Sequence, residues 1–180
     1  MDMSNQQKSY GTNQTQGLVR GALVTALYIA LTVVVAPVAY GPIQFRISEA
    51  LNFIGLYNRR YIYSITLGVM IVNFLQSNLL DVVVGGFHTL ISLLIARWLG
   101  EKVVQWLGEK AKHPLFVRYI VMTFVFTATM FIIAWMLIHL GYENYFWQTY
   151  GVLALSEFIV MTLGGLVMYF LIDPRINFYQ

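Results

Sequence analysis

The chain has 180 residues, of which 58% are apolar and 11% charged, with a formal net charge of +3 and a mean hydropathy of +0.66. This composition excludes an ordinary soluble domain and is typical of a polytopic membrane protein. At about 20 residues per membrane crossing, it leaves no room for a separate catalytic domain. The absence of cysteine excludes disulfides, thiolate metal sites and cysteine nucleophiles.

The polar N-terminal segment, residues 1–17, is expected to be a mobile cytoplasmic tail because it is rich in Gln, Asn and Ser. The apolar runs then predict a domain of six helices over residues 18–173, followed by a cytoplasmic tail at 174–180. The helices are expected at about 18–39, 47–58, 61–78, 80–100, 115–140 and 149–172, with a polar, partly helical connection at 101–114. The second helix is short, since twelve residues rise only about 18 Å and the bilayer core is about 30 Å thick.

The basic residues predict the orientation of these helices. If the first helix starts in the cytoplasm, ten of the 11 Lys and Arg residues lie on the cytoplasmic side, as the positive-inside rule expects. Arg46 alone falls outside. If the second helix did not cross, Arg59 and Arg60 would face outward and the asymmetry would weaken. The distribution therefore favours six crossings with both termini in the cytoplasm. It also explains the net positive charge, which is thus no indication of nucleic-acid binding.

Acidic and amide side chains gather instead toward the outer side. Glu157 lies about two turns below the expected start of the last helix, and ionisable groups at membrane depth are functional candidates by default. Asn73 lies about one and a half turns below the outer end of the third helix. Together these polar groups predict an outward-facing pocket. The candidate ligand-binding residues are Gln44, Arg46, Glu49, Asn73, Asp81 and Glu157.

Each candidate also has a purely structural explanation. Arg46 can be an interfacial anchor, or it can pair with Glu49, three residues further on, and only orient the loop. Glu157 and Asn73 can each form interhelical hydrogen bonds. Asp81 can cap the helix that it begins, where a negative charge is favoured.

Other motifs bear on catalysis and on partners. His88 and His139 lack metal-ligand spacing and are expected to be structural. The sequence contains no phosphate-binding loop, zinc-protease motif or nucleophile elbow, so we expect no catalytic residue, metal or cofactor. Small residues recur every four positions on the first helix, which lets another helix approach closely, either from a partner or within the bundle. They are Ala22, Ala26 and Ala30.

Two segments resemble a known family. The run Y-G-P-I-Q-F-R-I-S-E-A-L at 40–51 resembles the loop and second-helix start of the QueT family, as do Asn73 and the run D-V-V-V-G-G at 81–86. These proteins are substrate-binding S components of energy-coupling factor (ECF) transporters, and the resemblance extends from about residue 17 to residue 172. It implies a six-helix protein of the prokaryotic plasma membrane, with a lid loop between the first two helices.

The resemblance also implies a ligand and partners. The ligand is a queuosine precursor, a 7-deazaguanine base captured from outside. The alanine stripe matches the small residues that dock onto EcfT, a membrane scaffold protein, and two ATPases supply the energy. A carboxylate such as Glu157 or Glu49 suits the N1–H and amine of a guanine-type edge. Arg46 suits the base carbonyl, Asn73 or Gln44 the carbonyl and ring nitrogens, and Asp81 a cationic aminomethyl group.

Three other functions remain open from the sequence. The protein can be an S component for a different heterocyclic vitamin, or a small autonomous carrier or channel. It can also be a membrane enzyme that acts on a lipid headgroup with Glu157 or His139 as base, although no motif spacing favours that chemistry.

Overall fold

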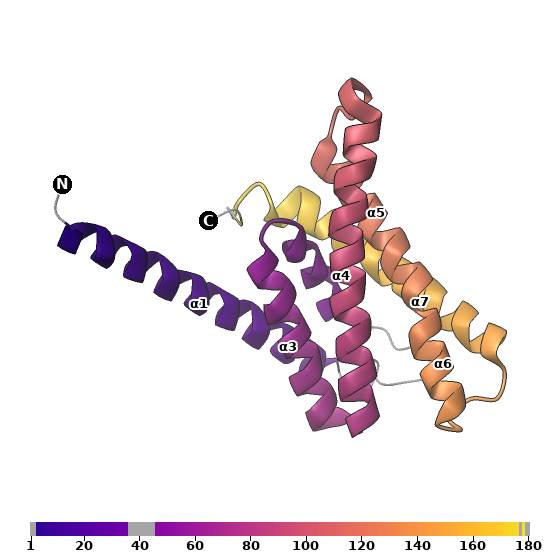
Figure 1. Ribbon diagram of the computed structural model, residues 1–180. Helices are drawn as coiled ribbons and strands as arrows, with labels where there is room; N and C mark the ends of the chain where they lie inside the picture. Colours follow the sequence, from indigo (N-terminus) through magenta and orange to yellow (C-terminus); the bar gives the residue numbers. More distant parts are fainter. Residues whose placement is uncertain (1–2, 36–45, 177, 179–180) are drawn as a thin grey trace.

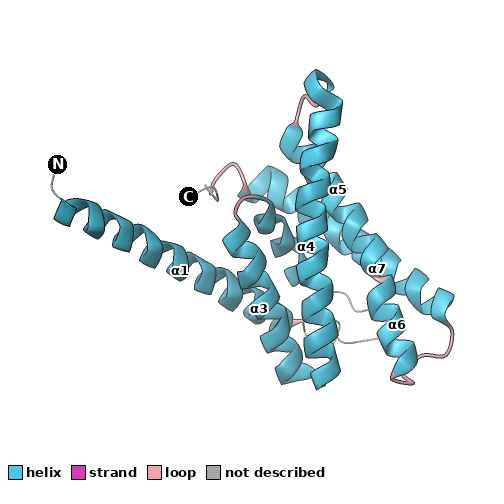
Figure 2. Ribbon diagram, in the orientation of Figure 1, coloured by secondary structure: helices cyan, strands magenta, loops and turns pink. Residues whose placement is uncertain are grey.

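The structure is a computed structural model that describes residues 3–35, 46–176 and 178. The described residues form helices and short connections, with no strand among them (Figure 2). The α-helices are α1 (Met3–Val34), α3 (Arg59–Gln76), α4 (Leu79–Leu107), α5 (Pro114–Thr129), α6 (Phe131–His139) and α7 (Phe146–Val167). Two 3₁₀ segments, η1 (Ile47–Leu56) and η2 (Gly108–Lys110), and a π-helical segment, η3 (Met168–Ile172), complete the order.

The helices form one bundle from which the N-terminal half of α1 projects (Figure 1). α4 packs against α3 on one side and α5 on the other, α1 packs on α3, and α5 packs on α7. Local sequence sets the helix starts. Asn58 and Asn78 each cap a helix with the side-chain oxygen, and Pro114 opens α5, where a missing N–H costs nothing.

Four segments are long and apolar enough to cross a membrane: Gln14–Val34, Leu79–Lys110, Pro114–His139 and Phe146–Ile172. The prediction of an all-helical, multi-pass membrane protein is therefore confirmed. α3 has 18 residues and η1 has 10, and their crossings, like the cytoplasmic placement of both termini, remain predictions. The predicted lid loop includes residues 36–45, which lie outside the described residues.

The second predicted helix differs most from expectation. It is a 3₁₀ helix rather than an α-helix, and eight of its residues, including Ser48 and Glu49, are buried. It packs against α1, α3 and α7, and Phe53 stacks on Tyr119 of α5 with ring centroids 4.3 Å apart. η1 thus lies in the centre of the bundle and is not a helix whose side chains mainly face lipid. Its ten residues rise about 20 Å at about 2.0 Å each.

Other boundaries also need correction. The helix expected at 115–140 is two helices that meet at Met130. The interruption follows Thr129, whose hydroxyl donates back to the carbonyls of Val125 (2.9 Å) and Phe126 (3.1 Å) and thereby competes with the helix ladder. The helix of the first crossing begins already at Met3, and α4 continues to Leu107, into the predicted polar connection.

Candidate functional site

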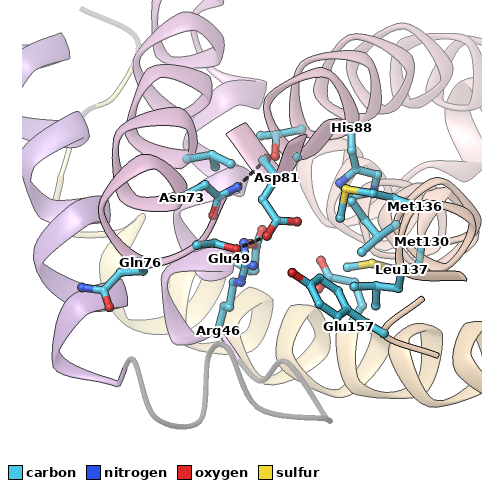
Figure 3. Close-up of a pocket in the computed structure, with 16 residues that line it drawn as sticks. Arg46, Glu49, Asn73, Gln76, Asp81, His88, Met130, Met136, Leu137 and Glu157 are labelled. Carbon is cyan, nitrogen blue, oxygen red and sulfur yellow. Dashed lines mark hydrogen bonds between the residues drawn. The ribbon is translucent and has the colours of Figure 1, made fainter. Parts of the chain in front are cut away.

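A cavity of about 240 Å³ lies where the start of η1, the end of α3, the start of α4, α6 and the middle of α7 meet (Figure 3). One side is polar and another is apolar, with Met130, Ile133, Met136 and Leu137. The polar lining consists of Arg46, Glu49, Asn73, Gln76, Ser77, Asp81, His88, Thr89, Tyr142 and Glu157. Such a cavity has the mixed character of a small-molecule site.

Five of the six candidate ligand-binding residues line this one cavity, although they come from four different elements. They are Arg46, Glu49, Asn73, Asp81 and Glu157. Gln44 lies outside the described residues. The structure thus brings these five side chains together at one cavity, while their contact with a ligand remains a prediction.

Glu49 is held firmly from two sides. The Tyr28 hydroxyl of α1 donates to Oε1 at 2.9 Å, and the Asn52 amide donates to Oε2 at 2.5 Å. The Glu49 side chain is only 6% exposed, so both carboxylate oxygens are satisfied within the bundle. This arrangement connects α1 to the cavity and holds the Glu49 carboxylate at its wall from two sides.

Asp81 is organised by its own helix start. Its carboxylate accepts from the side chains of Ser77 and Asn78, the latter at 3.0 Å, while its backbone N–H donates to Asn78 at 3.0 Å. The Asn73 amide donates to the Asp81 carbonyl at 2.9 Å and so joins α3 to α4 (Figure 3). The structural roles considered for Asp81 and Asn73, helix capping and interhelical bonding, are therefore both present, at the cavity wall.

Glu157 differs from the other two acids. Its side chain is 3% exposed, and Oε1 accepts no hydrogen bond from the described residues. It interacts unfavourably with the charge of Glu49 and favourably with that of Arg46. A buried acceptor left without a donor costs about 1–3 kcal/mol, and more when it is charged. Glu157 therefore offers an open, unsatisfied acceptor to whatever enters the cavity.

The cavity as a whole is acidic. Glu49, Asp81 and Glu157 carry three negative charges when ionised, against the single positive charge of Arg46, which acts electrostatically on Asp81, His88 and Glu157. This balance favours a ligand that carries a positive charge or many hydrogen-bond donors. The apolar side, with its two methionines, suits a flat ring.

Sequence reasoning missed some lining residues. His88 was expected to be structural, and its Nε2 does form a hydrogen bond with the Thr129 hydroxyl at 3.0 Å, but the residue also lines the cavity. Its spacing offered a signal, since Asp81, Gly85 and His88 follow one another at i, i+4 and i+7 on one helix face. Met130 and Met136 offered none, because apolar residues are common on every face of these helices.

Two further predictions concern other parts of the chain. Ala22, Ala26 and Ala30 are all exposed on α1, and their role in docking remains a prediction. Among the described residues, no group of three or more His, Asp or Glu side chains is arranged to hold a metal.

Comparison with known proteins gives the family. The family model described as "QueT transporter" matches residues 18–173. The protein named "Queuosine precursor transporter QueT" from Lactococcus lactis subsp. cremoris (strain MG1363) is 37% identical over 158 residues, which cover 87% of this chain and 92% of that protein. No solved structure matches the chain significantly. The chain therefore belongs to the QueT transporter family and is a multi-pass membrane protein of a prokaryote.

Proposed function

We propose that the protein is the substrate-binding S component of an ECF-type importer and that it captures a queuosine precursor, a 7-deazaguanine base, from outside the cell. The observation that carries this proposal is the open carboxylate oxygen of Glu157, buried in a polar cavity beside Arg46 and Asn73. Family membership and the name of the lactococcal relative support it.

The chemistry of the cavity suits such a base. A guanine-type edge presents an N1–H and an amine side by side, and one carboxylate can accept from both. Glu157 fills this role because Glu49 already accepts two hydrogen bonds from the protein. The ring lies against the apolar side near Met130 and Met136. A cavity of about 240 Å³ is smaller than the roughly 300–1,000 Å³ of drug-sized sites, as suits a single base.

The remaining groups of the cavity suit the other atoms of the base. Arg46 donates to the ring carbonyl, and the amides of Asn73 and Gln44 can donate and accept. The carboxylate of Asp81, which lies at the cavity wall, attracts an aminomethyl cation on the base. The loop that contains Gln44 closes over the ligand as a lid.

Energy for import comes from partners in this proposal. The sequence has no phosphate-binding loop of the G-x-x-x-x-G-K-[ST] type, so two partner ATPases hydrolyse ATP and the chain itself catalyses no reaction. The exposed stripe of Ala22, Ala26 and Ala30 lets α1 lie closely against EcfT.

A ligand panel tests the substrate. The purified protein in detergent is heated with 7-aminomethyl-7-deazaguanine, guanine, thiamine, riboflavin or biotin, since a ligand that binds only the native state raises the Tm. We expect the deazaguanine to raise the Tm most. A larger rise with one of the vitamins would instead identify an S component for that vitamin and would refute the proposed substrate.

Uptake into vesicles tests the mechanism. Vesicles that contain EcfT, the two ATPases and this chain should take up the base only when ATP is present on the side of the ATPases. Ala26→Leu should abolish uptake but preserve base binding, while the exposed control Leu23→Ile on the same helix should support both. ATP-independent uptake by the chain alone would instead support an autonomous carrier.

A further inference from the structure

A second cavity, of about 270 Å³, lies at the opposite end of the α3–α4 pair from the candidate site. It is a groove between the first turns of α3 and the second half of α4. Arg59, Ile62 and Tyr63 contribute from α3, and Leu94, Arg97 and Trp98 contribute from α4. The proposed transport function uses none of these residues, so a role for the groove is independent of that function.

The guanidinium of Arg97 is held in place by the protein and is partly exposed to the groove. Its Nη1 donates to the carbonyls of Gly55 (3.2 Å) and Leu56 (3.3 Å), and its Nε lies 3.6 Å from Glu101 Oε1. None of these contacts with described residues uses Nη2, and the side chain is 23% exposed. The guanidinium is thus fixed in place while one of its nitrogens remains available, which reduces the entropy cost of binding.

Arg59 supplies a second guanidinium. It is exposed and lines the groove, whereas the neighbouring Arg60 turns its guanidinium toward Gly17 of α1. Glu101, at the rim, offsets one of the two positive charges. The groove therefore keeps a net charge of +1, and two guanidinium groups from different helices flank it. Such a pair favours phosphate over a simple monovalent anion.

The groove also continues into the lipid-facing surface. Tyr63 is 64% exposed and begins a stripe of exposed apolar residues on α3, continued by Leu67, Met70 and Phe74 at i+4, i+7 and i+11. Trp98 is 61% exposed and ends a similar stripe on α4 that includes Phe87 and Leu94. Tyr and Trp are enriched where the acyl chains of a bilayer meet its headgroups.

We infer that this groove binds the headgroup of an anionic phospholipid. Arg59 and Nη2 of Arg97 hold the phosphate, Tyr63 and Trp98 lie at headgroup level, and the acyl chains run along the stripes of α3 and α4. The groove is at the basic end of the bundle, where Lys102, Lys110, Lys112 and Arg118 also lie. Basic pockets between membrane helices are suited to anionic headgroups.

Native mass spectrometry of the full chain, stripped of lipid in detergent, tests this inference. Phosphatidylglycerol should form a 1:1 complex at a concentration at which phosphatidylcholine with the same acyl chains does not. Arg59→Gln should weaken the complex at least about fivefold, since it removes one charge-assisted contact. The control Lys102→Gln removes one charge from the same end of the bundle, outside the groove, and should leave binding within about twofold.

Other results would overturn the inference. Equal binding of phosphatidylcholine would show that no anion is recognised, and equal weakening by Lys102→Gln would show only diffuse attraction to a basic surface. Glycerol phosphate competes in a further arm. If it binds as tightly as phosphatidylglycerol, the site takes a soluble phosphate and no lipid. Arg59 is exposed, and unchanged lipid binding by a folded Arg59→Gln protein would exclude the groove directly.

Discussion

The two ends of the α3–α4 pair carry charge in opposite ways. At one end, Glu49 and Glu157 are almost completely buried beside a cavity. At the other end, Arg59 and Lys102 are exposed to the surroundings. Charges that only orient a protein in the membrane can remain solvated, whereas a buried charge costs several kcal/mol unless something compensates it.

The difference shows which charges demand a functional explanation. The exposed Lys and Arg side chains of the basic end fit the positive-inside rule, although the cytoplasmic placement of this end remains a prediction. At the acidic end, Glu49 and Asp81 are compensated by hydrogen bonds from the protein itself. Glu157 is compensated least, because its Oε1 has no donor among the described residues.

Glu157→Gln is therefore the variant that tests this difference most strongly. The amide keeps the shape but has an NH2 donor in place of one carboxylate oxygen, so it cannot accept from the N1–H and the amine of the base side by side. We therefore expect the Kd for the base to rise about 100-fold, or about 2.7 kcal/mol. Isothermal titration calorimetry on the purified protein measures it. Glu143→Gln, in the exposed connection between α6 and α7, is the matched control and should bind like the native protein. Equal Kd values for both variants would remove Glu157 from the site.

A second prediction concerns Gly85. A Cβ at this position would lie 2.6 Å from the Asn73 amide nitrogen. Gly85→Ala should thus displace the Asn73 side chain, break its bond to the Asp81 carbonyl and raise the Kd about tenfold.

Gly86→Ala provides the matched control for Gly85→Ala. At this neighbouring position, the three atoms nearest to a Cβ all belong to the Met70 side chain, with Cγ at 2.7 Å, and Met70 does not line the cavity. We therefore expect it to bind the base nearly normally in the same titration. Similar loss in both variants would mean that helix packing, rather than Asn73, controls the site.

Tyr28→Phe should have a smaller effect. It removes the hydroxyl that donates to Glu49 Oε1 and frees one oxygen of that carboxylate. A single neutral donor contributes about 1 kcal/mol, so the Kd should change about three- to sixfold. Tyr63→Phe, on the exposed face of α3, serves as control. An unchanged Kd for Tyr28→Phe would show that the position of Glu49 does not depend on α1.

The smallest effect on base binding is expected at the basic end. Arg59→Gln should leave the Kd for the base within about twofold, because the groove and the cavity lie at opposite ends of α3 and screening removes long-range effects. The same titration checks it, with Lys102→Gln as control. A large loss for Arg59→Gln alone would mean that the two ends are coupled.

The sequence alone predicts two features of this architecture: the difference between the two ends and the meeting of polar groups at one of them. The positive-inside count separates the two ends, and the depth of Asn73 and Glu157 along their helices predicts that they meet. Both inferences use only the order of residues along the membrane normal. The second agrees with the structure, in which Asn73 and Glu157 line one cavity, because a bilayer forces long apolar runs to lie roughly parallel; the orientation stays a prediction.

Other features could not be predicted in this way. A helix in lipid is apolar on every face, so periodicity does not reveal that Met130 and Met136 face the cavity. The interruption after Thr129 depends on a hydroxyl that contacts His88 and Ser92 of another helix. The 3₁₀ segment η1 packs against α1, α3 and α7, which are contacts between elements far apart in the sequence that local periodicity does not contain.

A structure of the protein with 7-aminomethyl-7-deazaguanine bound would test the proposed site without any intermediate assumption. We expect one base in the cavity between η1, α4 and α7, with its N1–H and amine within hydrogen-bond distance of Glu157 and its ring against Met130 and Met136. A base bound elsewhere, for instance in the apolar groove between α5 and α7 near Phe124 and Phe158, or one whose polar edge avoids Glu157, would contradict the proposal.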